Sequence, residues 1–140
     1  MTDATTKPTR LDPIMTVDGA FFWKAATEGR FVAQKCGGCA KLWHPPRALC
    51  PNCHSTEKGE QALSGLGKVI SWVMPLHPPA FGFAGPPIVV LVEVDEGLRF
   101  VSNLEGVAPQ DIRLGMRVKV GFAPTMGGKQ VPIFHPVEEA

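Results

Sequence analysis

The stretch CGGCAKLWHPPRALCPNC, residues 36–53, decides how this chain folds. Ten residues separate two C-x-x-C pairs, and the pairs contain every cysteine of the chain: Cys36, Cys39, Cys50 and Cys53. Two such pairs can turn four thiolates toward one centre and close a tetrahedral site that suits a structural Zn²⁺. The sequence therefore predicts a rubredoxin-like zinc ribbon over residues 30–62, with iron as the main alternative metal. We expect the stretch between the two pairs to form a hairpin, with Pro45-Pro46 at or near its turn.

A site closed by four thiolates leaves no position for water, so we expect the metal to stabilise the fold and to take no part in a reaction. His54 directly follows the last cysteine and could contact the ligands from outside. Free thiols or redox-active pairs are the weaker alternative, because two pairs in matching register would then be a coincidence. Basic residues outnumber acidic ones between residues 30 and 58. They either form a modest basic patch, which could bind phosphates or an acidic partner surface, or are ordinary solvated charges.

Composition limits the class of protein. The chain has 140 residues, 14 Lys and Arg, 13 Asp and Glu, and a net charge of +1. This near-neutral charge argues against a non-specific nucleic-acid binder. No apolar run approaches the ~18–20 residues of a membrane span, and the polar N-terminus lacks the apolar stretch of a secretory signal. The sequence therefore predicts a cytoplasmic protein with no membrane segment.

Strand-like runs follow the cysteines, with turn residues between them. The clearest is IVVLVEV at residues 88–94, whose β-branched side chains predict a buried strand. Strands are predicted at residues 67–74, 88–94, 98–104, 116–122 and 129–134. Five short strands without strand–helix alternation indicate a small barrel of the OB type over residues 63–140, so the predicted fold class is mainly β.

Residues 1–29 are predicted to form a polar tail and one short helix. We expect the tail, residues 1–12, to lie loosely on another part of the protein. Asp18 is placed to cap the helix and Gly29 to end it. The apolar side chains at positions 21–23 point in different directions, because successive helical residues are about 100° apart. We expect a helix that is wedged between the two domains, or one that also contacts another chain.

A loop rich in proline and glycine, residues 75–87, carries Phe81 and Phe83. Its prolines prevent regular strand pairing, so no helix or sheet can bury these rings there. The rings either fold back over one mouth of the barrel or form an exposed apolar surface for an acyl chain or a partner protein.

The sequence contains no recognisable catalytic set. Residues 64–67 (SGLG) lack the form of a nucleophile elbow, and neither a third glycine nor a lysine follows to make a phosphate-binding loop. Three of the four histidines stand beside prolines, which places them in loops or at strand ends: His44, His77 and His135. We therefore expect no catalysis by this chain alone.

The order of these features resembles the DUF35 family of zinc-ribbon and OB-fold proteins. The resemblance covers roughly residues 14–136. It is carried by Phe21-Phe22-Trp23, Gly29 to Cys39, Pro45-Pro46-Arg47, Cys50 to Cys53, Ser64 to Val69 and Pro87 to Gly97. Ala40 departs from the pattern, because a glycine commonly follows the second cysteine, and this slightly loosens the first pair.

The resemblance implies an accessory subunit for acyl-CoA chemistry. Such a subunit is not catalytic alone; it stabilises a thiolase, a thiolase-like aldolase or an acyltransferase of lipid, aromatic or steroid catabolism and helps to form the acyl-CoA site. The implied ligands are a structural Zn²⁺ and a shared acyl-CoA, and the implied assembly is a heterotetramer with two copies of each chain. Candidate contacts to acyl-CoA or the partner are Phe22, Trp23, Arg47, Phe81 and Phe83.

Two other functions use the same domains. A nucleic-acid-binding module would combine a zinc ribbon with aromatic stacking faces on the barrel, but the near-zero charge disfavours it. A free-standing acyl-CoA binder would need a basic residue for the phosphates. Arg47, which follows the rigid Pro45-Pro46, is the first candidate, and its alternative role is a salt bridge that braces the ribbon.

Overall fold

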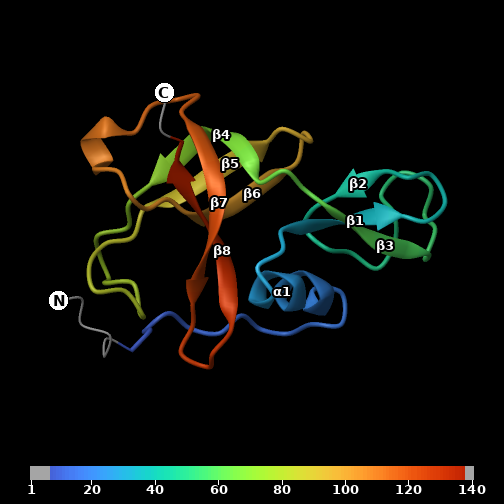
Figure 1. Cartoon of the computed structure of the whole chain (residues 1–140), viewed down its shortest axis with the longest axis horizontal. Helices are drawn as coiled ribbons and strands as arrows, with labels where there is room; N and C mark the ends of the chain where they lie inside the picture. The colour runs from blue at the N-terminus through green and yellow to red at the C-terminus, as the bar shows by residue number, and fades with distance from the viewer. Residues whose placement is uncertain (1–6, 138–140) are drawn as a thin grey trace.

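The computed structural model describes residues 7–137, which form two antiparallel sheets and one α-helix (Figure 1). The smaller sheet has the strand order β2-β1-β3 and contains β1 (Val32–Cys36), β2 (Leu42–Trp43) and β3 (Lys58–Ala62). The larger sheet has the order β6-β5-β4-β7-β8. Its strands are β4 (Leu66–Val73), β5 (Val89–Val94), β6 (Arg99–Asn103), β7 (Arg117–Pro124) and β8 (Gln130–Pro136).

The larger sheet curls into a partly open barrel. The first and last strands in its order meet at one end, where the Ser102 hydroxyl donates to the Pro132 carbonyl at 2.7 Å and Leu104 pairs with Phe134. A one-turn 3₁₀ helix, η1 (Pro109–Asp111), lies between β6 and β7. All five predicted strands are present, and the predicted mainly β fold class, with a helix, a ribbon and an OB-type barrel, is confirmed.

The barrel core follows the alternation of its strands. In β5, Val90, Val92 and Val94 are buried and the residues between them are half-buried, because successive side chains point to opposite faces. Phe134, on β8, is fully buried in the same core. No helix of the described part of the chain is long and apolar enough to cross a membrane.

The glycines of the SGLG stretch are required by close packing at the start of β4. Gly65 has a φ of +80°, and a Cβ there would lie 2.5 Å from a methyl group of Val120. A Cβ on Gly67 would lie 2.6 Å from the Glu93 carbonyl oxygen. These positions let β4 pass between its two neighbours, so the stretch has a structural use rather than a catalytic one.

The helix α1 (Ala20–Thr27) packs between the two sheets, and Phe22 is its main core residue. The ring centroid of Phe22 lies 6.4 Å from that of Phe31, at the entry to the ribbon, and 6.2 Å from that of Phe100 on β6. This agrees with a helix wedged between the domains. The prediction that Asp18 caps the helix is wrong: the N-cap is Gly19, with no side-chain cap, and the Gly19 N–H instead bonds to the Thr16 hydroxyl.

Two features of the ribbon differ from the sequence predictions. The β1–β2 turn is formed by the first cysteine pair itself, so Pro45-Pro46 lie beyond the hairpin rather than at its turn. Strand β3 pairs with β1 along its whole length and was not predicted, because its sequence, KGEQA, is polar and mostly exposed.

The described part of the tail is fixed to the barrel. Figure 1 shows this segment crossing the lower end of the β7–β8 hairpin on its way to α1. The Thr9 hydroxyl donates to the Gly82 carbonyl, and Arg10 bonds to Asn103 and Glu105. The Asp12 carboxylate accepts the Gly127 N–H at 2.8 Å. Residues 7–12 therefore lie on another part of the protein, as expected, but hydrogen bonds hold them in place, so this part of the tail is not loose. Residues 1–6 fall outside the described residues.

Candidate functional site

The four cysteines come together at the far end of the ribbon. Their Sγ atoms all lie within 4.8 Å of one another. The Cys36 and Cys53 sulfurs are 3.5 Å apart, and the Cys39 and Cys50 sulfurs are 3.6 Å apart. A tetrahedral Zn²⁺ with Zn–S bonds of about 2.3 Å requires S···S distances of about 3.8 Å, so the cluster has the size of such a site.

Backbone N–H groups surround the sulfurs in the same way in both pairs. Gly38 and Cys39 donate to the Cys36 sulfur at 3.2 and 3.3 Å, and Asn52 and Cys53 donate to the Cys50 sulfur at 3.3 and 3.5 Å. Such donors stabilise negative charge on sulfur, and metal binding requires the thiolate.

The Asn52 side chain adds a donor that links the two pairs. Its amide nitrogen lies 3.5 Å from the Cys39 sulfur. Hydrogen bonds from the Asn52 side chain and the Lys41 backbone lower the pKa of the Cys39 thiol to about 6. The donor set thus fits a structural Zn²⁺, held by four thiolates with no position left for a reacting molecule.

Each cysteine pair ends with the same backbone turn. The residues that follow the second cysteines, Ala40 and His54, have φ values of +65° and +62°, the only non-glycine residues with positive φ in the described chain. Their N–H groups donate to the carbonyls of Cys36 and Cys50, respectively. His54 is exposed, and its place after the cysteine is explained by this turn rather than by metal contact.

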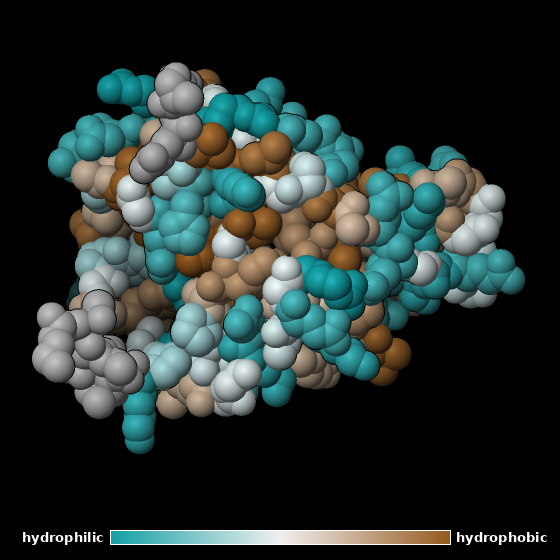
Figure 2. Space-filling view, in the orientation of Figure 1, coloured by the Kyte–Doolittle hydropathy of each residue, from teal (hydrophilic) through white to brown (hydrophobic). Residues whose placement is uncertain are grey.

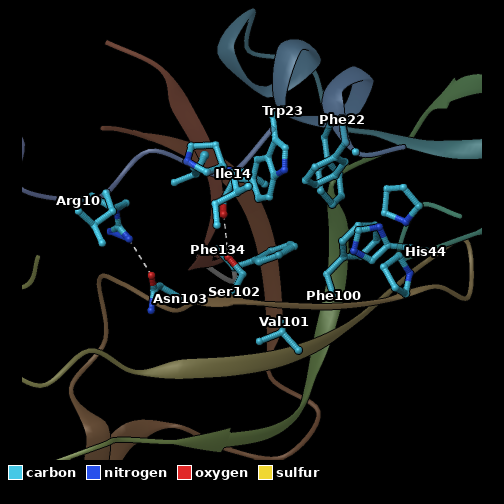
Figure 3. A pocket seen from close by; sticks show the side chains of 18 of the residues that line it. Arg10, Ile14, Phe22, Trp23, His44, Phe100, Val101, Ser102, Asn103 and Phe134 are labelled. Atoms are coloured by element: carbon cyan, nitrogen blue, oxygen red, sulfur yellow. Dashed lines mark hydrogen bonds between the residues drawn. The ribbon is translucent and has the colours of Figure 1, made fainter. Parts of the chain in front are cut away.

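A second candidate site is a cavity of about 900 Å³ between α1, the N-terminal segment, β6 and the ribbon. Its walls are mostly aromatic and aliphatic, and none of the aspartates and glutamates in the described part of the chain lines it. Figure 3 shows Trp23 and Phe22 descending from α1 on one side, with Phe134 and Phe100 facing them. A half-open apolar cavity of this size suits an apolar ligand group or side chains of another protein.

One end of the cavity is formed by Arg10 and the 75–87 loop. The Arg10 guanidinium donates to Asn103 at 2.7 Å and pairs with Glu105 at 2.8 Å. It also lies 5.0 Å from the centre of the Phe83 ring, a cation–π contact. These contacts fix the N-terminal segment to the loop and explain why Phe83 is half-buried, whereas Phe81 is 77% exposed.

The other end of the cavity is formed by His44. Its imidazole stacks on Phe100 with 4.0 Å between ring centroids, and its Nδ1 is buried without a hydrogen-bond partner among residues 7–137. Burial lowers the pKa of His44 to about 4, so the ring is neutral at pH 7. The ribbon therefore covers part of the barrel with an uncharged aromatic ring.

The structure brings four of the five predicted contact residues to this cavity: Phe22, Trp23, Phe81 and Phe83. Arg47 does not line it. The Arg47 side chain is exposed and forms no ion pair within residues 7–137, and only its backbone N–H is held, by the buried Gln34 side chain at 2.8 Å. The alternative role of Arg47, a salt bridge that braces the ribbon, is therefore not seen.

Arg10, His44 and Phe100 are among the cavity residues that sequence reasoning missed. The signal for His44 was present in its place before Pro45-Pro46, which puts it in a loop, but only the packing of the ribbon on β6 shows which ring it covers. Arg10 stood in a segment with no regular pattern. Figure 2 shows apolar side chains at the surface over the barrel, within an otherwise largely hydrophilic face.

Comparisons with known proteins agree with this architecture. Residues 23–59 match the rubredoxin-like zinc ribbon domain of ChsH2, and residues 60–123 match the C-terminal OB-fold domain of ChsH2. A solved structure described as Ltp2-ChsH2(DUF35) aldolase superposes with a TM-score of 0.86 at 38% identity, over 89% of this chain and 98% of that one.

Two relatives show how this chain compares in length. A probable enoyl-CoA hydratase alpha subunit of Thermomonospora curvata is 38% identical over 96% of this chain, but the chain spans only 42% of that relative's length. A DUF35 domain-containing scaffold protein of Pyrococcus furiosus is 35% identical over 71% of this chain and 74% of its own length. The chain therefore belongs to the DUF35 family, with the zinc ribbon and OB fold of ChsH2.

Proposed function

We propose that this protein is a non-catalytic accessory subunit of a thiolase-type acyl-CoA enzyme, which it stabilises and whose acyl-CoA site it helps to form. The observation that carries the proposal is the half-open apolar cavity and its rim. Ile14 and Phe81 line the cavity yet are 84% and 77% exposed in the isolated chain. Apolar residues around an apolar cavity favour contact with another protein.

The comparisons support the class of partner. The matched solved structure is described as an aldolase formed by Ltp2 and ChsH2, and the relative in Thermomonospora curvata is described as a hydratase alpha subunit. Both descriptions name an enzyme of more than one part. We infer a cytoplasmic heterotetramer with two copies of each chain, since a dimeric partner offers two equal docking sites.

Acyl-CoA is the shared ligand in this proposal. The end of the cavity at Phe81 and Phe83 receives the acyl group, because these two rings are apolar and the Phe81 ring is 77% exposed. Phe22 and Trp23 form the inner wall. Arg47 follows Pro46, which lines the cavity, and from that rim it contacts a CoA phosphate. The nucleophile and the base belong to the partner, and the Zn²⁺ site keeps the ribbon folded.

Co-expression with the thiolase-like proteins of the same genome tests the assembly. We expect co-purification with one of them and a mass by light scattering that equals two copies of each chain. Ile14→Asp should weaken the complex at least about tenfold, because it places a charge in an apolar contact away from the acyl end of the cavity. Leu114→Asp is the matched control, since Leu114 is also exposed but does not line the cavity. Separate elution of the two proteins would overturn the proposal.

Titration of the chain and of the complex with octanoyl-CoA and with CoA tests the ligand. We expect the complex to bind octanoyl-CoA more tightly than CoA, and Arg47→Ala to weaken both. Equal affinity of the isolated chain and the complex for octanoyl-CoA would favour a free-standing acyl-CoA binder instead.

A further inference from the structure

Strand β6 meets the cavity along its edge rather than with one face. All five residues of β6 line the cavity: Arg99, Phe100, Val101, Ser102 and Asn103. Side chains of a strand alternate between two faces, so a face would contribute only every second residue. In Figure 3, Phe100 and Ser102 project toward the labelled aromatic residues of α1 and β8, whereas Val101 projects to the opposite side of β6.

The hydrogen bonds of β6 show which backbone groups face outward. Val94 donates to the Leu98 carbonyl and Leu104 donates to the Ile88 carbonyl. In an antiparallel pair, hydrogen-bonded and non-hydrogen-bonded positions alternate. The backbone groups of Phe100 and Ser102 therefore point toward β5, and those of Arg99 and Val101 point away from it.

These outward groups lack backbone partners within residues 7–137. The barrel closes only beyond them, where the Ser102 hydroxyl bonds to Pro132 and Leu104 pairs with Phe134. The first half of β6 is thus an open edge with two N–H donors and two carbonyl acceptors.

This edge carries few of the features that normally protect one. Natural edge strands carry charges, prolines or bulges that prevent pairing with other chains. Here Arg99 is the only charged residue of the strand, and Val101 is 73% exposed. Its cross-strand neighbour Leu91 adds to the apolar surface. The edge is therefore suited to pairing, with apolar side chains on both of its sides.

We propose that an extended segment of the partner subunit adds to β6 as a further strand of the barrel sheet. Its backbone pairs with Arg99 and Val101, and alternate apolar side chains enter the cavity beside Phe100, leaving the Phe81 end to the acyl group. Arg99 lines the cavity with its side chain 64% exposed, and it contacts Glu93 only through Nε, at 3.3 Å. A carboxylate of the segment therefore lies opposite the other two nitrogens of the Arg99 guanidinium. Strand addition supplies affinity through the backbone and specificity through alternate side chains. This inference rests on the proposed function.

Hydrogen exchange tests the pairing directly, with the full-length chain free and in its complex with the co-purified thiolase-like protein. In the free chain, the amides of Arg99 and Val101 should exchange fast and those of Phe100 and Ser102 slowly. In the complex, we expect exchange at Val101 to slow by at least about tenfold. The already protected Phe100 amide provides an internal reference.

Substitutions provide the second measurement. Val101→Pro removes an outward N–H that β5 does not use, so the barrel should stay folded while the complex weakens by about tenfold or more. Val101→Thr, which keeps the N–H and the branched shape, should weaken it far less. Arg99→Glu should weaken the complex, and raised salt should reduce the difference between this variant and the wild type.

A complex in which Val101 stays unprotected and Val101→Pro binds normally would overturn strand addition and leave the accessory-subunit proposal intact. Absence of any complex would overturn both.

Discussion

The separate hydrophobic cluster of the ribbon consists of Cys36, Trp43 and Cys50, whereas the barrel and α1 share a larger apolar core that runs from Phe22 to Phe134. Both regions are antiparallel sheets of short strands. In the ribbon, two of the three core residues are also metal ligands, so the metal takes the place of a hydrophobic core. In the barrel, burial of valine and phenylalanine supplies the stability.

The two regions are also specified by different features of the sequence. The ribbon is specified by a few cysteines at fixed spacing, and its strands can be short and polar. The barrel is specified by alternation over whole strands. Loss of a metal ligand should therefore unfold the ribbon, and loss of a buried side chain should destabilise the barrel.

The largest effect is expected from Cys50→Ser, which removes one of the four thiolates. Structural zinc contributes on the order of 10 kcal/mol to the folding of small zinc domains, so residues 30–62 should unfold. The barrel should remain folded because its core does not depend on the metal. Hydrogen exchange should show loss of protection at Lys35 and retained protection at Val92.

A chelator strong enough to remove the metal from wild-type protein should reproduce this pattern, and Ser55→Ala is a control in the same segment. Simultaneous loss of protection in both regions would mean that ribbon and barrel unfold as one unit.

The next effect is expected from Phe134→Ala in the barrel. Phe134 is fully buried, and removal of a buried phenylalanine side chain typically costs about 3–5 kcal/mol through lost burial and a residual cavity. Phe81→Ala is the matched control, since Phe81 is mostly exposed and should change the free energy of unfolding by less than about 0.5 kcal/mol. Denaturant unfolding of both variants makes the comparison, and equal costs would contradict the core assignment.

The sequence was sufficient for the elements that repeat a local pattern. Alternation and β-branching located β5, and turn residues located the hairpin after it. The cysteine spacing predicted the cluster because both pairs are local motifs that need only one contact between them. Phe22 and Trp23 stood out because apolar residues covered more than one side of the helix.

The sequence was insufficient where a residue's role depends on a distant partner. His44 becomes a wall of the cavity only because the ribbon packs on Phe100, fifty-six positions further along the chain. Arg10 acquires its contacts from Phe83, Asn103 and Glu105. Strand β3 is polar and is held by pairing with β1, so its own composition gave no signal.

His44 connects the two regions, and its titration should make their contact sensitive to pH. Because burial lowers its pKa from 6.5 to about 4, the unfolded chain binds a proton before the folded chain does. The contribution of neutral His44 to the free energy of unfolding is complete above pH 6.5 and is lost as the pH falls toward 4. Between pH 7.5 and pH 5 the free energy of unfolding should decrease by about 2 kcal/mol. Urea unfolding over this range measures it.

His44→Phe should flatten this part of the profile, whereas replacement of the exposed His77 by phenylalanine should leave it unchanged. Since both variants retain the thiolates, any metal loss at low pH affects them equally. An unchanged profile in His44→Phe would show that another group is responsible.

The smallest effect is expected within the ribbon, at the turn that ends the first cysteine pair. Ala40 has a φ of +65°, which costs a residue with a Cβ about 1–2 kcal/mol relative to glycine. Ala40→Gly removes this strain but gives the unfolded chain more freedom, so we expect a net gain of about 0.5–1 kcal/mol. Ala48→Gly, at a position without positive φ, should instead lose stability. Thermal unfolding of the zinc-loaded proteins measures both changes. If the ribbon is stabilised by its metal and its turns rather than by a core, these two substitutions of the same type must differ in sign.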